Sequence, residues 1–232
     1  GASQIKLMAG GGVSSLYDQL EDVQYFEDEL HAAVMAAEDA GTYVMVHVYV
    51  PEAIRRAIRA GVKSIEHGQL IDEPTMKLIA EKGVWLSMQP FIGEGNNHYT
   101  NPVQQAKHEL VVQGTDRAYQ LAKKYGVKLA WGTDLLFSPA NARNQNLNIE
   151  KMTRWFSNFE ILKMITHDNA ELLALSGRRN PYPGKLGVIE EGALADLIVV
   201  DGNALEDIKV LTDPGKNMLL IMKDGKIYKN DL

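Results

Sequence analysis

Residues 41–67, GTYVMVHVYVPEAIRRAIRAGVKSIEH, decide the fold. The apolar run at residues 43–48 predicts a buried strand, and Pro51 predicts the start of a helix because proline suits a first helical turn. Gly61 is expected to end that helix, and residues 62–67 then predict a second strand. This order of elements predicts a βαβ unit with parallel strands.

The same pattern recurs on both sides of this stretch. An amphipathic helix that ends at a glycine and is followed at once by a short apolar strand occurs four times in all. The predicted helices cover residues 27–40, 51–60, 73–82 and 103–125, and the predicted strands cover residues 4–8, 43–48, 62–67, 84–88 and 127–131. Five strands that alternate with helices predict an α/β fold whose parallel sheet is buried on both faces.

The character of the chain changes near residue 178. A helical stretch is expected over residues 150–175, with a restart near Asn169. The following segment is rich in turn residues and then β-like, and Asp224-Gly225 is a strong signal for a short hairpin. We therefore predict two parts, residues 1–178 with the βα units and residues 179–232 as an all-β appendage.

Composition excludes several classes of protein. The chain has 232 residues, a net charge of -6 and no cysteine, so disulfide frameworks, zinc ribbons and thiol catalysis are ruled out. The chain has no run of basic residues interleaved with aromatic residues, the pattern that would indicate nucleic-acid binding. It also has no apolar stretch that approaches the length of a membrane span. Neither nucleic acid nor a membrane is thus expected as a partner. The sequence leaves the cellular compartment open.

Candidate functional residues gather where the predicted strands end. Lys6 lies in the first strand, His47 and Tyr49 at the end of the second, His67 at the end of the third, and Asp134 after the fifth. In parallel α/β folds the reacting groups collect at the carboxyl ends of the strands. Two imidazoles, a carboxylate and a lysine there are suitable parts for a hydrolytic metal site.

Each of these residues also has an ordinary interpretation. A single histidine at a strand end is more often structural than a ligand, and an aspartate after Gly-Thr often caps a helix or forms a turn. Lys6 is harder to explain in this way, because its apolar neighbours predict an amine turned into the interior, where an unpaired ammonium is costly. A buried amine tends to be neutral, and a neutral amine can form a carbamate with carbon dioxide.

The combined pattern resembles the binuclear branch of the amidohydrolase superfamily. The resemblance rests on residues 1–12, GASQIKLMAGGG, on residues 64–68, SIEHG, on residues 131–134, WGTD, and on residues 192–201, GALADLIVVD. It implies a partial (β/α)8 TIM-type barrel, strands 4 to 8, followed by the C-terminal segment of a small β-sandwich. It also implies a ligand set of Lys6, His47, His67 and Asp134.

One part of the family pattern is absent from this chain. Members carry a His-x-His pair on barrel strand 1, and no such pair occurs here. A barrel of this kind takes about 250 residues, whereas only residues 1–178 precede the β-rich tail. We therefore expect a fragment of a longer protein that is weakly active by itself.

The resemblance implies a mechanism. A carbamate on Lys6 would bridge two divalent ions, most suitably zinc, and a hydroxide between the ions would attack the scissile carbonyl. Asp134 would accept the proton and pass it to the leaving amine.

The segment His47-Val-Tyr-Val-Pro-Glu-Ala-Ile resembles prolidase-like and arginine-carboxypeptidase-like members, which implies a dipeptide or a short N-blocked amino acid as substrate. Tyr49 could bind the substrate carboxylate or belong to barrel packing. The loop at residues 137–143 could add contacts through Arg143, although a solvated arginine is the simpler interpretation.

Two alternatives remain open. A mononuclear relative, similar to imidazolonepropionases or deaminases, would share the histidines but would have no use for a bridging carbamate on Lys6. A non-catalytic half-barrel would instead pair its open strand edges with another chain, as a homo-oligomer or a hetero-complex.

Overall fold

The structure is a computed structural model that describes residues 1–93, 99–135 and 139–232. By its internal contacts the chain divides into a first unit, residues 1–130 and 172–181, and a second unit, residues 131–171 and 182–232. The sequence predicts a division at residue 178, with residues 131–171 in the first part. By internal contacts these residues group instead with the C-terminal segment. As a domain boundary, residue 178 stays a prediction.

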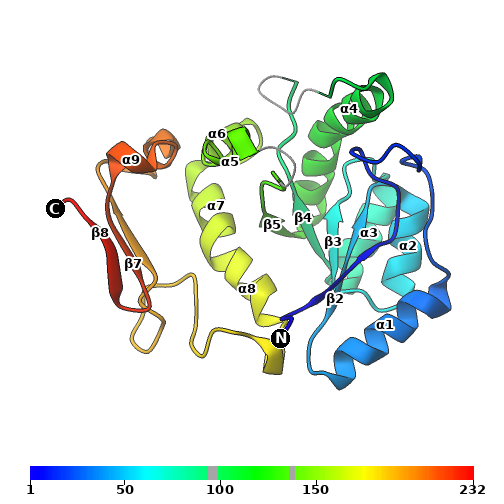
Figure 1. Cartoon of the computed structure of the whole chain (residues 1–232), viewed down its shortest axis with the longest axis horizontal. Helices are drawn as coiled ribbons and strands as arrows, with labels where there is room; N and C mark the ends of the chain where they lie inside the picture. The colour runs from blue at the N-terminus through cyan, green and yellow to red at the C-terminus, as the bar shows by residue number, and fades with distance from the viewer. Residues whose placement is uncertain (94–98, 136–138) are drawn as a thin grey trace. The chain divides into compact units, whose positions relative to one another are not determined.

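The first unit is built on a five-stranded sheet with the strand order β1-β2-β3-β4-β5 (Figure 1). The strands are β1 (Ile5–Met8), β2 (Val44–Val48), β3 (Ser64–His67), β4 (Trp85–Met88) and β5 (Lys128–Trp131). Strands β1 to β4 pair in parallel with one another. Sequential parallel order confirms the predicted βαβ winding, in which each helix returns the chain to the same end of the sheet.

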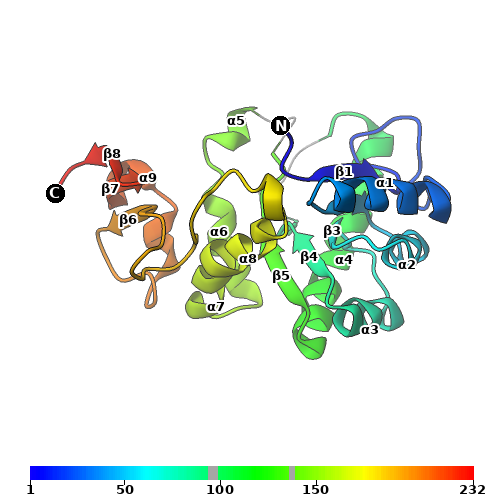
Figure 2. The same cartoon turned by 90° about the horizontal axis from the view of Figure 1, so that it is seen from below.

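Four helices connect these strands, and Figures 1 and 2 show α1, α2 and α3 on the same side of the sheet. They are α1 (Glu27–Asp39), α2 (Pro51–Arg59), α3 (Glu73–Lys82) and α4 (Pro102–Tyr125). Gly83 and Gly126 end α3 and α4 with φ angles of 64° and 62°, a left-handed conformation that glycine adopts without steric cost. The glycine stops read from the sequence are therefore confirmed at these helices.

The core of the first unit lies along the central strands. Every residue of β3 and β4 is buried, as are four of the five residues of β2. By contrast, three of the four residues of β1 are exposed, because β1 is the first strand of the sheet and has a single neighbouring strand. Burial of the sheet on both faces is thus confirmed for the central strands and wrong for β1.

Asp72 caps the start of α3 by accepting a hydrogen bond from the Thr75 amide at 2.9 Å. Burial raises the pKa of Asp72, but hydrogen bonds from Thr75 and the charge of Arg55 outweigh it, and the net pKa is lowered. The stabilisation is therefore present above the ordinary value of 3.8 and is lost as pH falls through the lower, folded-state pKa.

We expect Asp72→Ala to lower the free energy of unfolding by about 1 kcal/mol at neutral pH, because an N-cap is removed. The difference from the wild type should shrink on acidification below the pKa of Asp72. Urea unfolding at several pH values measures it. Asp72→Asn, which preserves a capping oxygen, is the control; an equal loss in both variants would contradict a capping role.

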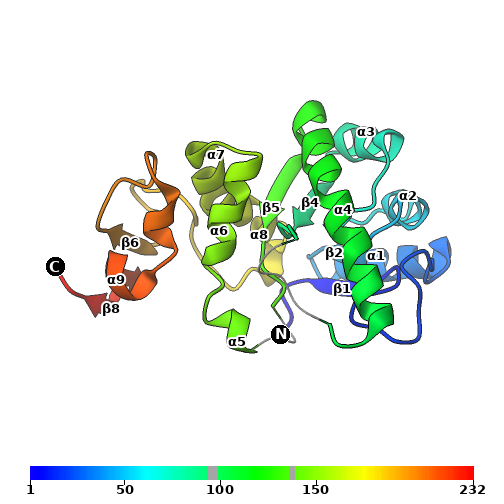
Figure 3. The ribbon, with the colours of Figure 1, turned by 90° about the horizontal axis from the view of Figure 1, so that it is seen from above.

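The second unit contains a three-stranded antiparallel sheet, β6 (Leu197–Val200), β7 (Met218–Lys223) and β8 (Lys226–Asn230). Asp224 and Gly225 join β7 and β8 with φ angles of 48° and 74°, which confirms the predicted hairpin turn. Figure 3 shows α9 (Pro214–Asn217) beside this sheet. The short helix η4 (Ile208–Leu211) precedes α9.

The helical stretch expected over residues 150–175 is observed as a series of short helices. They are α6 (Leu147–Lys151), η1 (Met152–Arg154), α7 (Asn158–Lys163), the π-helix η2 (Met164–Asp168) and α8 (Asn169–Ala174), with α5 (Pro139–Ala142) before them and η3 (Gly177–Arg179) after them. Ser157 restarts the helix with a capping box to Glu160. The predicted restart at Asn169 is observed, directly after the π-helix.

Among the residues described, no helix combines the length and apolar character needed to cross a membrane.

Candidate functional site

His47 and His67 lie together although they come from different strands. His67 pairs in register with Val48, so regular alternation would turn it to the face opposite His47. His67 ends β3 with a φ of 79°, however, and this left-handed conformation turns its ring back. The ring centroids of the two histidines are 4.4 Å apart. Such a conformation is uncommon outside glycine and is typical of functional sites.

The hydrogen bonds of the two rings assign their tautomers. Nε2 of His47 lies 3.1 Å from the carbonyl oxygen of Gly11. A carbonyl can only accept, so Nε2 donates the proton and Nδ1 has the lone pair. His67 has the opposite arrangement, since its Nδ1 donates to Oε1 of Gln89 at 2.7 Å, which puts the lone pair on Nε2. Histidines that bind metals typically donate their second nitrogen in this way.

Both rings are buried, with relative exposures of 8% for His47 and 2% for His67. Burial is the main reason why the pKa of His67 falls well below 6.5, and the electrostatic effects of its neighbours His47 and Lys6 lower it further. The hydrogen bond with Gln89 acts in the opposite direction without reversing the shift. His67 is therefore neutral at physiological pH, the form in which imidazole binds metals.

Lys6 lies on the same face of the sheet as His47, because it pairs with Met45, two residues before His47. Its charge is close enough to lower the pKa of His67. The predicted burial of Lys6 is wrong, since the side chain is exposed on the edge strand β1. The carbamylation of Lys6 and its metal binding stay predictions.

Tyr49 is next to both histidines, with ring centroids 5.1 Å from His47 and 5.2 Å from His67. It is also part of a buried apolar cluster with Val13, Leu20 and Val111. The packing interpretation of Tyr49 is thus supported directly, and its position beside the histidines leaves binding of a substrate as a prediction.

Asp134 belongs to the second unit, where its side chain is exposed and its φ is 49°. Its predicted convergence with the histidines therefore stays a prediction. Of the loop at residues 137–143, residues 137 and 138 lie outside the described part, and Arg143 is exposed. In the described ranges, no group of three or more His, Cys, Asp or Glu residues could by itself hold a metal ion.

The donor set of the first unit nevertheless fits part of a metal centre. Two adjacent imidazoles, each with one ring nitrogen engaged in a hydrogen bond, are a common half of a zinc site. The sequence profile of the amidohydrolase family matches residues 1–228 of the chain. The chain belongs to the amidohydrolase family.

Individual members show how the family resemblance extends over the chain. Ochratoxinase from Aspergillus niger is 34% identical over 233 aligned positions, which cover 99% of this chain and 47% of ochratoxinase. A prolidase solved with N-methylphosphonate-L-proline is 37% identical with a TM-score of 0.88, covering 99% of this chain and 55% of the prolidase. A Xaa-Pro dipeptidase solved with bound methionine is 32% identical, with a TM-score of 0.84 and coverages of 99% and 55%. The chain therefore spans about half the length of these relatives.

The sequence pattern does not identify Gln89 as a site residue. The end of β4 offered no strong metal ligand, and glutamine acts here only through His67. Its oxygen is oriented from the other side by Gln69, whose Nε2 lies 3.4 Å from both Oε1 and the backbone oxygen of Gln89. Its place at a strand end was the available signal.

We expect Gln89→Leu to weaken zinc binding by the chain by about 10- to 100-fold, the usual effect of losing the partner that orients a metal-binding histidine. Competition with a chromophoric chelator measures the affinity. Gln113→Leu, an exposed change in α4, is the matched control. Equal affinities for both variants would contradict a role for Gln89 in orienting His67.

Proposed function

We propose that the chain is part of a metal-dependent hydrolase that cleaves the amide bond of dipeptides or short N-acylated amino acids. The observation that carries the proposal is the pair His47 and His67, adjacent and buried, with complementary tautomers. The relatives support the substrate class, since they include a prolidase, a Xaa-Pro dipeptidase and ochratoxinase.

In this proposal Nδ1 of His47 and Nε2 of His67 hold one divalent ion, most suitably zinc. A divalent ion polarises a carbonyl oxygen and lowers the pKa of water to about 7. Gly11 and Gln89 keep the two rings in their binding tautomers, so little reorganisation is needed on binding. Burial of both rings keeps competing water away from them.

The remaining roles rest on the family resemblance. Lys6 would bridge two ions as a carbamate, and Asp134 would bind metal and accept the proton. Tyr49, beside both histidines, would donate a hydrogen bond to the carboxylate of the substrate. Because the chain lacks His-x-His, we expect it to turn over peptides slowly by itself.

A chimera tests the proposal. The N-terminal part of the prolidase relative that this chain does not match is fused ahead of Gly1, and on the family resemblance this part would supply the His-x-His pair. We expect zinc-dependent release of the C-terminal residue from dipeptides, abolished by His67→Ala and preserved in His31→Ala, a change to an exposed histidine of α1. A folded, zinc-loaded chimera without hydrolysis of dipeptides or N-acylated amino acids would contradict it.

The mononuclear alternative shares the two histidines and has no use for a carbamate on Lys6. The number of ions bound by the active chimera distinguishes the two. Two ions per chain, reduced by Lys6→Ala, support the binuclear site, and one ion that is unaffected by Lys6→Ala supports the mononuclear site.

A further inference from the structure

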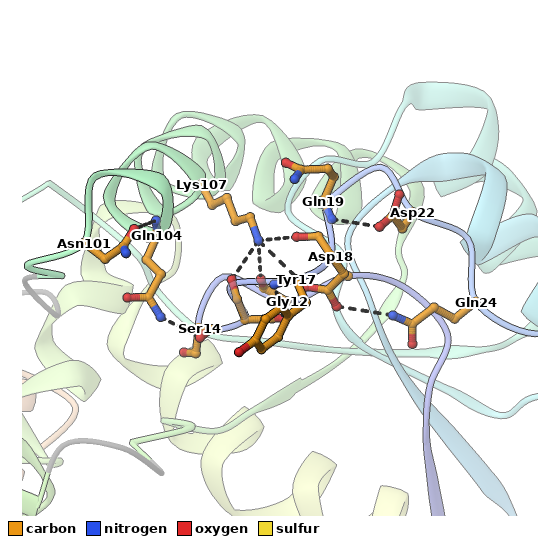
Figure 4. Close-up of polar contacts among 12 residues, drawn as sticks. Gly12, Ser14, Tyr17, Asp18, Gln19, Asp22, Gln24, Asn101, Gln104 and Lys107 are labelled. Atoms are coloured by element: carbon orange, nitrogen blue, oxygen red, sulfur yellow. Dashed lines mark hydrogen bonds and ion pairs between the residues drawn. The ribbon is translucent and has the colours of Figure 1, made fainter.

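Helix α4 contributes a buried lysine to the loop that follows β1. The Lys107 side chain is 5% exposed, and its ammonium group donates to the carbonyl oxygens of Gly12 at 3.2 Å and Ser15 at 2.9 Å, and to that of Asp18 (Figure 4). An ammonium has three donors, so three carbonyls satisfy it completely. The Asp18 carboxylate, 3.8 Å away, balances the charge.

This arrangement is more than a satisfied surface contact. Burying an ammonium group is costly unless it is paired and hydrogen-bonded, and Lys107 is both. Burial raises the pKa of Asp18, but hydrogen bonds from Ser15 and Gly12 and the charge of Lys107 lower it overall, so the carboxylate stays ionised beside the lysine. The lysine thus joins residues 12–18 of the loop to a helix that begins at Pro102.

The same loop contacts His47 through Gly11, the residue before Gly12, whose carbonyl oxygen Lys107 binds. The Gly11 oxygen accepts the proton of Nε2 of His47, and a side chain at Gly12 would reach that nitrogen at 3.7 Å. Gln104, one turn before Lys107 on α4, donates to the Ser14 oxygen at 2.6 Å, so the helix holds the loop at a second point (Figure 4).

We propose that Lys107 is a positioning residue for His47. Its ammonium group holds Gly12 so that the neighbouring Gly11 carbonyl stays on Nε2 of His47, and the lone pair therefore stays on Nδ1. The importance of this contact for metal binding rests on the proposed function, but the tautomer of His47 can be measured without any metal.

The absence of cysteine permits a sharp test. The Lys107→Cys variant has a single thiol. This thiol is alkylated in denaturant, and the chain is then refolded. 2-Bromoethylamine restores an ammonium group at nearly the length of lysine, and iodoacetamide attaches a neutral group as the matched control. Both products have the same backbone and the same linkage, so they differ mainly in the charged donor.

The readout is the tautomer of each imidazole in ¹H–¹⁵N NMR spectra at about pH 8, where an ordinary imidazole is neutral. We expect the ammonium product to show the wild-type pattern at His47 and the neutral product to show a mixture of tautomers. His67, held by Gln89, should be unchanged in both. Equal His47 patterns in the two products, or an equal disturbance of His67, would overturn the proposal.

If the alkylated chains do not refold, Lys107→Gln replaces them. Its amide has two donors for three carbonyls, so we expect a partial shift of the His47 tautomer, and a wild-type pattern overturns the proposal. Zinc affinity is measured in parallel and is expected to fall about 10- to 100-fold in the neutral product. Absence of zinc binding in the wild type would count against the proposed function alone.

Discussion

Replacement of His67 with alanine is expected to weaken zinc binding by the chain by at least about 100-fold, more than the loss of a residue that only orients a ligand. The variant removes Nε2, which has the lone pair, and leaves His47 as a single imidazole from this pair. Affinity is measured by competition with a chelator on the metal-free chain.

His31→Ala is the control for this prediction, because His31 lies in α1 and is exposed. It removes an imidazole from the chain without touching the pair. Equal losses of affinity in His31→Ala and His67→Ala would mean that zinc binds to scattered surface histidines, and the candidate site would have to be abandoned.

The second large effect is expected at Gly11. A Cβ atom at this position would lie 1.7 Å from the backbone oxygen of Gln19 and 2.7 Å from its carbon, so the backbone of the loop must move. We expect Gly11→Ala to lower the free energy of unfolding by about 2 to 3 kcal/mol, the upper range for overpacking. Urea unfolding provides the measurement.

Gly12→Ala is the matched control, since its Cβ would meet its nearest neighbour, Nε2 of His47, at 3.7 Å, an ordinary contact. Its stability should stay within about 1 kcal/mol of the wild type, the difference in backbone entropy between glycine and alanine. Similar stabilities for the two variants would contradict the tight packing of the loop against residue 19.

Much of the fold could be predicted because local signals and long-range packing agree. Glycine-terminated helices followed by apolar runs located the four strands β2 to β5, an apolar run alone located β1, and Asp224-Gly225 located the hairpin. The helical character of residues 150–175 and the restart near Asn169 could be predicted, but the interruption before the capping box at Ser157 and the π-helix could not, because the apolar spacing is helical throughout. Periodicity does not detect such breaks.

The candidate metal ligands could be predicted from the sequence, but the residues and backbone conformations that orient them could not. His47 and His67 could be found from their places at strand ends, but the positive φ that turns His67 toward His47 has no sequence signal outside glycine. Gln89 and Lys107 act across separations of 22 and 95 residues, to His67 and to Gly12. Only the three-dimensional fold brings them together. The predicted burial of Lys6 was wrong because an edge strand exposes residues that a central strand would bury.

X-ray absorption spectroscopy of the zinc-loaded chain tests the central claim most directly, namely that His47 and His67 bind one ion together. We expect two imidazole nitrogens at about 2.0–2.1 Å from zinc. In the His47→Ala, His67→Ala double variant this imidazole signal should disappear. A single imidazole in the wild type, or a spectrum that the double variant leaves unchanged, would contradict the account.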